Sequence, residues 1–300
     1  MAEREFRWEA AETRRDYLVT ELSDPEEIRA LLRTRVEYTA YALGQLEPEL
    51  FIRTHWYRAV GETGTGLVLH SRGGLGDATF TMGEAASVEA ILSIYPGRPN
   101  TYATCQPQHI DALKRVYRLA NQQPMIRMGV LKGGFIPMEG GAQTMLLTGL
   151  DIRRINGLYS TDGTTSYYVP EHIDAGVYRG AMVDGRLVAV AGTHVVSRQE
   201  RVAVVGNVFT HPAYRGRGYA TAVTSVVTEA LFEFCDHVVL TVDPSNRPAI
   251  SAYQKLGYRE VCQLVEASAV RKDPTGIGAG LRRLRAGIRG RRYGGAFVSR

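Results

Sequence analysis

The sequence predicts a mixed α/β protein made of two successive copies of one fold. Its 300 residues, 44% of them hydrophobic and 22% charged, are enough for two globular domains of ordinary size. In each half the expected elements have the same order: a helix, three strands, a helix, a strand, a helix and a strand. In the second half, a Val-rich strand at 202–210 leads through a glycine-rich loop into a helix with regular apolar spacing.

The first half begins with a polar segment, residues 1–23, that we expect to be peripheral. Asp24-Pro25-Glu26-Glu27 predicts the start of a helix that runs to about Leu46, because acidic residues favour a first helical turn. Apolar patterns predict the other elements. We expect strands at 51–60, 66–71, 77–81, 101–105 and 125–131, and helices at 84–94 and 108–121.

The second half follows a glycine-rich stretch, residues 133–141, that predicts a linker. Asp184-Gly185 predicts a two-residue hairpin between two of its strands. We expect helices at 145–159, after the glycine-rich loop, and up to Leu256, and strands at 175–183, 186–196, 202–210, 237–242 and 258–267.

The glycine-rich loop after the strand at 202–210 carries the first chemical signal. Gly216 and Gly218 have no Cβ, so the backbone there can approach a ligand closely. The next helix begins with unpaired N–H groups and a partial positive charge, which favour a phosphate. Arg215 and Arg217 add charge that suits a pyrophosphate. An ordinary strand-to-helix turn is the alternative on this loop alone.

The second signal is the helix that ends at Leu256. Asn246 is a suitable N-cap, Pro248 suits the first turn, and Gly257 suits the position after the last residue. Tyr253 follows Asn246 by about two helical turns, so both side chains can face the same side.

Together, the two blocks resemble the GNAT superfamily of acyltransferases. The family's patterns fall on Arg215, Gly218 and Ala220, and then on Asn246, Ala249, Tyr253, Gly257 and Tyr258. The resemblance implies acetyl-CoA or another acyl-CoA as co-substrate, no metal, and a V-shaped slot in which pantetheine pairs with the strand at 202–210. The cofactor-binding residues that it implies are Val208, Phe209, Thr210, Arg215, Gly216, Arg217, Gly218, Tyr219, Ala220, Thr221 and Asn246. Among these, the N–H groups from Arg215 to Thr221 are expected to hold the pyrophosphate.

The resemblance also implies direct acyl transfer to a primary amine. The attacking ammonium, with a pKa of about 10, must first lose a proton. The developing oxyanion needs a donor, which in this family is a strand N–H and here lies near Val208. The departing thiolate needs an acid, and Tyr253 is the matching residue; the alternative role of Tyr253 is that of a core aromatic.

The general base is less well defined, because no Glu lies between Arg201 and His211. Asn207 could position a water molecule. His194 and His211 are candidate bases by their ordinary pKa, and each has a structural role as its alternative. Further candidates on loops are Glu139, Glu171 and His172. The proton could also leave through a chain of water molecules.

The first half offers Met82-Gly83-Glu84-Ala85-Ala86 where the phosphate loop should be. This segment has one glycine, no arginine and an acid that would repel phosphate. We therefore expect a degenerate GNAT-like domain at 1–135, a catalytic GNAT domain at 136–272 and a basic, disordered tail at 273–300. An unrelated α+β domain is the alternative for the first half.

The formal net charge of +5 comes from the tail. Residues 271–300 contain nine Lys or Arg and one Asp, a charge of +8, so the other 270 residues carry −3. We expect no nucleic-acid partner beyond contact with this tail. No apolar run approaches the ~20 residues of a membrane helix, and the start of the sequence does not have the pattern of a signal peptide. The three separated cysteines favour a reduced, cytoplasmic protein. We also expect no membrane contact, and a monomer or a homodimer.

The sequence thus predicts an acyl-CoA-dependent N-acyltransferase, most simply an N-acetyltransferase, that acts on a small amine or amino acid. A non-catalytic acyl-CoA sensor or scaffold is an alternative, since a carboxylate base is not evident. An enzyme that acetylates proteins or peptides is another, and would need an open groove.

Overall fold

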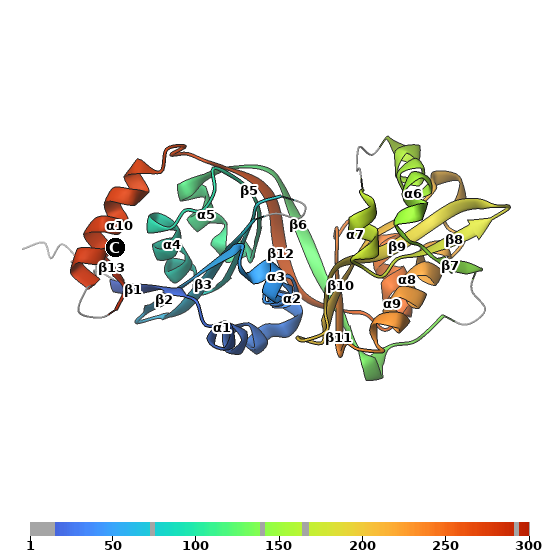
Figure 1. Ribbon diagram of the computed structural model, residues 1–300, viewed down its shortest axis with the longest axis horizontal. Helices are drawn as coiled ribbons and strands as arrows, with labels where there is room; N and C mark the ends of the chain where they lie inside the picture. The colour runs from blue at the N-terminus through green and yellow to red at the C-terminus, as the bar shows by residue number, and fades with distance from the viewer. Residues whose placement is uncertain (1–15, 73–75, 139–141, 164–167, 291–293, 300) are drawn as a thin grey trace, which may run out of the picture.

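The computed structural model describes residues 16–72, 76–138, 142–163, 168–290 and 294–299, which form two lobes lying side by side (Figure 1). The elements of the first half are β1 (Asp16–Leu22), α1 (Pro25–Leu32), η1 (Arg33–Arg35), α2 (Val36–Gly44), α3 (Pro48–Phe51), β2 (Thr54–Gly61), β3 (Gly64–Ser71), β4 (Ala78–Gly83), α4 (Ala85–Ile94), β5 (Asn100–Cys105), η2 (Pro107–His109), α5 (Ile110–Val116) and β6 (Tyr117–Leu131).

The second half contains the elements that carry the candidate site. They are η3 (Lys132–Gly134), β7 (Thr144–Leu146), η4 (Gly149–Asp151), α6 (Ile152–Tyr159), η5 (Ser160–Asp162), α7 (Pro170–Asp174), β8 (Arg179–Val183), β9 (Arg186–Ser197), β10 (Val202–Thr210), η6 (Pro212–Tyr214), α8 (Tyr219–Leu231), β11 (His237–Val242), α9 (Arg247–Lys255) and β12 (Arg259–Arg271). The chain ends with α10 (Ile277–Gly290) and β13 (Ala296–Ser299).

The described strands form one 13-stranded mixed sheet in the order β13-β1-β2-β3-β4-β5-β12-β6-β11-β10-β9-β8-β7. Apart from β13, this order is symmetric about the central β12–β6 pair, as two copies of a single fold would produce. Each lobe contains one parallel pair at the same place, β4–β5 in the first lobe and β10–β11 in the second.

The two halves exchange their last strands. β12, from the second half, pairs with β5, and β6, from the first half, pairs with β11. β6 and β12 run as long neighbouring ribbons between the lobes (Figure 1). The boundary expected near residue 135 therefore does not separate two independent sheets, because each lobe takes a strand from the other half of the chain.

Helices from both halves cover the sheet around β10. On one face, α8 and α9 pack in a core that includes Ala203 and Val205. On the other face, α6 and α7 form a second cluster with β9, while α2 of the first lobe packs over Val202, Val204 and Val239. Alternate residues of a strand face opposite sides, so both sides of β10 are covered by apolar packing. The site beside β10 is thus bounded by helices of both lobes.

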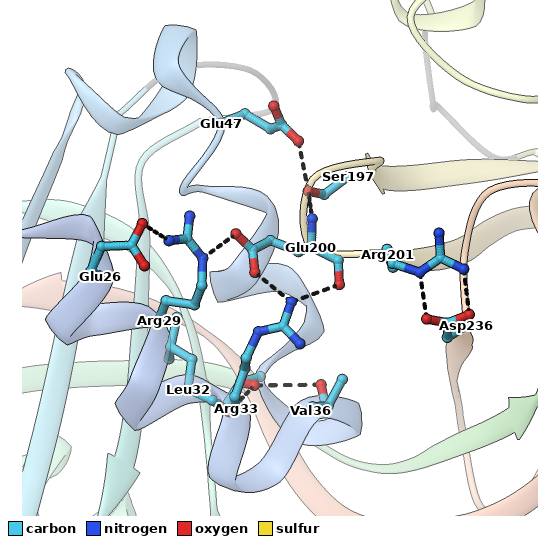
Figure 2. Close-up of polar contacts among 11 residues, drawn as sticks. Glu26, Arg29, Leu32, Arg33, Val36, Glu47, Ser197, Glu200, Arg201 and Asp236 are labelled. Atoms are coloured by element: carbon cyan, nitrogen blue, oxygen red, sulfur yellow. Dashed lines mark hydrogen bonds and ion pairs between the residues drawn. The ribbon is translucent and has the colours of Figure 1, made fainter.

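A polar cluster also joins the lobes (Figure 2). Glu200, in the turn between β9 and β10, accepts hydrogen bonds from Arg29 at 2.7 Å and Arg33 at 3.1 Å. Ser197, on the same hairpin, donates to Glu47 at 2.6 Å. The Glu200 side chain is 1% exposed, so the two guanidinium groups compensate a buried charge.

Several element predictions are confirmed, and others are wrong where distant strands pair. The hairpin at Asp184-Gly185 is confirmed: both residues have positive φ, at 49° and 75°, between the antiparallel strands β8 and β9. Residues 1–23 are not wholly peripheral, because β1 lies between β13 and β2. The helices expected at 108–121 and 145–159 are shorter, since the end of the first and the start of the second join strands β6 and β7.

The expectation of a disordered tail at 273–300 is also wrong for the described residues. Helix α10 packs against α4 through a narrow face of small residues that includes Ala279 and Ala286, and β13 pairs with β1. Arg282 donates to the carbonyl oxygen of Ser93 at 2.8 Å. Ala and Gly allow a close helix approach, so the tail can pack without large apolar residues on its buried side.

In the first lobe, side chains of the protein already bond to backbone groups of α4 and β4, which correspond to those that would bind a cofactor in the second lobe. The Glu84 carboxylate caps α4, accepting from the N–H groups of Ala86 at 3.0 Å and Ser87 at 2.6 Å. Beside β4, Tyr38 donates to the carbonyl oxygen of Thr81 at 2.6 Å, and His109 contacts the Thr81 hydroxyl at 2.8 Å. The N-terminus of α4 therefore already has an anion, as the acid in this segment suggested.

Candidate active site

The candidate site lies where β10 separates from β11. The two strands pair in parallel as far as Val205 and Leu240, although both strands continue beyond these residues. We call the resulting opening the fork. β10 therefore leaves β11 at the strand where the sequence predicts a V-shaped slot.

The direction of the backbone groups on β10 follows from its pairing with β9. The His211 N–H donates to the carbonyl oxygen of Val188 at 2.8 Å, on the side away from β11. Backbone groups of successive residues face opposite edges of a strand, so those of Val208 and Thr210 face the fork. The Thr210 carbonyl oxygen accepts from Arg215 Nε at 3.1 Å.

The loop before α8 exposes a row of amide donors. Gly216 and Gly218 have φ of 77° and 84°, a left-handed conformation that favours glycine. A Cβ on Gly216 would meet no atom within 4 Å, so open space lies beside this loop. Ala222 donates to the Gly218 carbonyl oxygen at 3.0 Å, whereas the amide N–H groups of residues 216–221 have no acceptor in the described part of the chain. These N–H groups, which include those of Tyr219, Ala220 and Thr221, form a cradle at the positive end of a 13-residue helix.

The two arginines of the loop differ in their contacts. Arg215 forms an ion pair with Asp162 at 3.1 Å, and its own N–H donates to the carbonyl oxygen of Pro212 at 3.3 Å. Its amide is therefore engaged, which corrects the expectation that it joins the cradle. The Arg217 guanidinium lies over the Tyr214 ring, 5.3 Å from the centroid, and forms no ion pair with any described residue.

Helix α9 holds Asn246 and Tyr253 as expected. Asn246 caps the helix, with Oδ1 accepting from the Ala249 N–H at 3.2 Å, so the predicted N-cap is confirmed. Tyr253, on α9, is 7% exposed and packs in the core between the sheet and helices α8 and α9. Burial raises the pKa of Tyr253 to about 12, so the phenol keeps its proton at neutral pH. Within the described residues its hydroxyl has no hydrogen-bond partner.

Asn207 forms a bulge on β10 and does not face open solvent. It has φ of 55°, and the pairing with β9 shifts by one residue around it. Its Oδ1 accepts from the Tyr168 hydroxyl at 2.8 Å, and its Nδ2 donates to the Tyr178 hydroxyl at 2.7 Å. The Tyr159 hydroxyl donates to its carbonyl oxygen. The amide is therefore used to hold the bulge rather than left free to position water.

The three tyrosines around Asn207 were not predicted from the sequence. Burial raises the pKa of Tyr178 to about 12 and also raises the pKa of Tyr159 and Tyr168, so all three remain hydrogen-bond donors. They come from α6, from the segment before α7 and from the residue before β8. The concentration of tyrosine around residues 159–178 is a signal, but their spacing gives no reason to place them around Asn207.

His194 lies at the fork but is poorly suited to act as a base. It extends from β9 over Gly206, where an added Cβ would lie 2.0 Å from His194 Cδ2. Its ring is 6.0 Å from Tyr41 of the first lobe. The side chain retains exposed surface, but the surrounding protein atoms, and then the Arg127 charge, lower the pKa of His194 to about 4. A neutral His194 can accept a hydrogen bond but holds an abstracted proton weakly.

The other candidate bases lie at the start of η6, on α7 and outside the described residues. His211 Nδ1 accepts from the Ala213 N–H at 3.2 Å and so caps η6. Glu171 and His172 lie on the short helix α7. Glu139 lies outside the described residues.

No group of three or more His, Cys, Asp or Glu side chains in the described ranges is placed to hold a metal ion. Among the described helices, none is both long and apolar enough to span a bilayer.

The comparisons with known proteins identify a family for the part of the chain that carries the fork and the cradle. Residues 151–258 match the model of the Acetyltransferase (GNAT) family, and the C-terminal lobe is thus a GNAT domain. None of the curated proteins matches the chain. The match includes the fork, the cradle and α9, and it ends directly before β12.

Solved structures share the fold over both lobes. A Drosophila protein aligns with a TM-score of 0.59 at 12% identity, over 86% of this chain and 99% of its own. An acetyltransferase of the GNAT family from Colwellia psychrerythraea aligns with a TM-score of 0.51 at 10% identity, over 83% of this chain and 98% of its own. At these identities the similarity concerns the fold, including its two-lobed arrangement.

Proposed function

We propose that this chain transfers an acyl group, most simply acetyl, from acyl-CoA to the primary amine of a small molecule. The observation that carries the proposal is the position of the cradle at the open end of the fork. A diphosphate on the N–H groups of residues 216–221 would direct the rest of coenzyme A along β10. The backbone groups of Val208 and the N–H of Thr210 are then available to the pantetheine, whereas the Thr210 carbonyl oxygen already accepts from Arg215. Phe209 lies between these two residues, and Arg217 and Asn246 lie near the phosphates.

The proposed reaction is direct attack within the fork. The amine nitrogen bonds to the thioester carbon, the carbonyl oxygen becomes negative beside the Val208 N–H, and the C–S bond then breaks. Tyr253 donates its proton to the departing sulfur. Burial raises the pKa of a phenol and of a thiol alike, so acid and leaving group shift in the same direction.

Loss of the amine proton is assigned to water in this proposal. His194, held neutral, accepts a hydrogen bond from the incoming amine, and the proton passes to solvent through water molecules at the mouth of the fork. Asn207 holds the bulge in β10 just beyond the last residue that pairs with β11, while the pairing with β9 resumes at Phe209. The first lobe acts as a wall for the acceptor and binds no cofactor, since Glu84 already caps α4.

Two measurements test the proposal. Calorimetry should show binding of acetyl-CoA at a single site, and a thiol-release assay with a panel of small amines should show turnover that depends on the amine. Absence of acetyl-CoA and CoA binding would remove the proposed function.

A non-catalytic acyl-CoA sensor is a second candidate, favoured by the low pKa of His194 and by the lack of a Glu between Arg201 and His211 in the sequence. Binding of acyl-CoA without thiol release for any amine in the panel would select this alternative.

A further inference from the structure

A buried positive charge lies beside the fork without a counter-ion. Arg127, on β6, is 0% exposed, and none of its three guanidinium nitrogens has a hydrogen-bond partner among the described residues. Its guanidinium lies over the ring of Tyr41, 5.2 Å from the centroid. Arginine stays ionised in proteins, and a buried charge without a partner is strongly unfavourable. An anionic partner is therefore expected at this place.

The position of Arg127 connects it with the reaction site. Arg127 pairs with Thr241 on β11, directly after the last residue that pairs with β10. Residues directly opposite in an antiparallel pair share a face of the sheet, so Arg127 and Thr241 lie on one face. Val239, two residues before Thr241 on β11, lies on the same face and packs in the cluster that includes α2. The Thr241 hydroxyl is also buried without a partner. Two unsatisfied groups thus meet at the closed end of the fork, on the side opposite α8 and α9.

The nearby carboxylates are committed elsewhere. Glu37 contacts His237 Nδ1 at 3.2 Å, and Glu266 accepts from the Tyr102 hydroxyl at 2.9 Å. Neither forms an ion pair with Arg127. The missing anion is therefore not supplied by these two neighbours.

We infer that Arg127 and Thr241 bind the carboxylate of the acceptor, so the acceptor is an amino acid or a similar molecule with both a primary amine and a carboxylate. This inference rests on the proposed function. A guanidinium offers two parallel donors that match a carboxylate, and the threonine hydroxyl adds a third. Because Tyr41 covers the guanidinium, its ring must turn aside when the acceptor enters from the α2 side. The amine then lies nearer the fork than the carboxylate.

Matched pairs of acceptors test the inference. Kinetics are measured for amino acids and for their carboxamides, such as glycine and glycinamide, with the wild type, Arg127→Met and Thr241→Val. The expected result is a preference of about 10²-fold in kcat/KM for the carboxylate in the wild type, expressed mainly in KM. Arg127→Met should bring this ratio close to one, and Thr241→Val should reduce it in part.

The outcomes distinguish this inference from the proposed function. If acyl-CoA binds and amines are acylated with no preference for the carboxylate, the role of Arg127 is refuted and the proposed function stands. If acyl-CoA does not bind, both are refuted. Should Arg127→Met fail to fold, the wild-type ratio and Thr241→Val still decide the question.

A second, independent observation concerns the outward face of α10. Four large aliphatic side chains are exposed along one stripe, at helical spacing: Ile277 at 66%, Leu281 at 54%, Leu284 at 63% and Ile288 at 59%. The buried residues Ala279 and Ala286 lie on the opposite face, toward the lobe. The stripe is therefore not part of the fold's own packing.

Exposed arginines border this stripe. Arg285 and Arg289 are exposed on its flank, and no ion pair with a described residue involves either. Helix α10 lies at the outer end of the first lobe, far from the fork (Figure 1). We propose that α10 rests on an anionic lipid surface, with the stripe in the headgroup boundary and the arginines on acidic headgroups. The proposal differs from the expectation of no membrane contact, because it assigns peripheral binding to this helix.

Vesicle flotation tests this surface. The full chain should bind vesicles that contain phosphatidylglycerol and not vesicles of phosphatidylcholine alone. The double variant Leu281→Ser/Leu284→Ser should bind at least about tenfold more weakly, whereas Leu150→Ser, which removes an isolated leucine that is 96% exposed, should bind like the wild type. Lack of binding to anionic vesicles, or equal binding by the double variant, would refute the proposal. Self-association that the double variant abolishes would instead assign the stripe to a second copy of the chain.

Discussion

Glu200 and Arg29 lie 171 positions apart in the sequence, yet Arg29 Nε donates to the Glu200 carboxylate at 2.7 Å across the two lobes. The carboxylate also accepts from Arg33, so two cations face one buried acid (Figure 2). This contact places the β9–β10 turn on α1 and thereby sets the position of β10 relative to the first lobe.

Removal of the Glu200 carboxylate should therefore destabilise the whole chain. We expect Glu200→Ala to lower the free energy of unfolding by about 2–3 kcal/mol, because it removes the buried partner of Arg29 and leaves that guanidinium only the exposed carboxylate of Glu26. Urea denaturation measures the change. Arg201→Ala, which breaks the exposed pair with Asp236, is the matched control and should leave the transition nearly unchanged. Equal effects of the two variants would contradict this account.

Gly218→Glu should abolish acyl-CoA binding, because it places a side chain and a negative charge in the cradle. Gly218→Ala separates the effect of charge from that of backbone strain, because both variants place a side chain at a position where φ is 84° in the wild type, at a cost of about 1–2 kcal/mol. Calorimetry should show no binding for the first variant and weakened binding for the second. Normal affinity in Gly218→Glu would mean that the cradle does not hold the diphosphate.

Tyr253→Phe should lower turnover by ~10²-fold or more while acyl-CoA affinity stays close to that of the wild type. The ring remains, so packing is kept and only the proton donor is lost. Since burial raises the pKa of Tyr253 to about 12, the wild-type rate should not decline through ionisation of this phenol up to about pH 10. Unchanged turnover in the variant would assign Tyr253 to the core alone.

His70 should make the first lobe sensitive to acid. The ring is 5% exposed, contacts Thr79 at 3.0 Å, and burial lowers its pKa to about 4. In the unfolded chain its pKa is near 6.5, so between pH 6.5 and 4 the unfolded state binds more protons and the folded state loses stability as pH falls. We expect a loss on the order of 2 kcal/mol at pH 4.5 from this group. Urea midpoints of the wild type and His70→Gln across this range should show a flatter dependence in the variant; parallel curves would contradict the assignment.

The features of the fold and the site that depend on a few consecutive residues could be predicted from the sequence. The glycine-rich loop before α8, the N-cap at Asn246 and the hairpin at Asp184-Gly185 each follow from a few consecutive residues. These features could be predicted because glycine and capping residues act on the backbone beside them.

Features that depend on distant pairing could not be predicted in this way. The exchange of β6 and β12 depends on how the whole sheet packs. The apolar pattern of each strand suits a place in either lobe, so the pattern alone does not say which lobe the strand joins. Arg127 is one residue in an otherwise ordinary strand, and its isolation is evident only when Tyr41 and Thr241 lie beside it. Disorder of the tail is predicted from its glycines and its few aromatic residues, and this prediction is wrong because Ile277, Leu281, Leu284 and Ile288 recur at helical spacing.

The exchange of β6 and β12 between the lobes also constrains the order in which a newly synthesised chain can fold. A fragment limited to residues 151–258 would lack both β6 and β12, leaving one long edge of β11 without a partner. During synthesis the first lobe must likewise wait until Arg259–Arg271 has left the ribosome before β5 gains its neighbour. Each half therefore lacks one neighbouring strand when the other half is absent, and we expect insertions or fusions to be tolerated better at the ends of the chain than between the lobes.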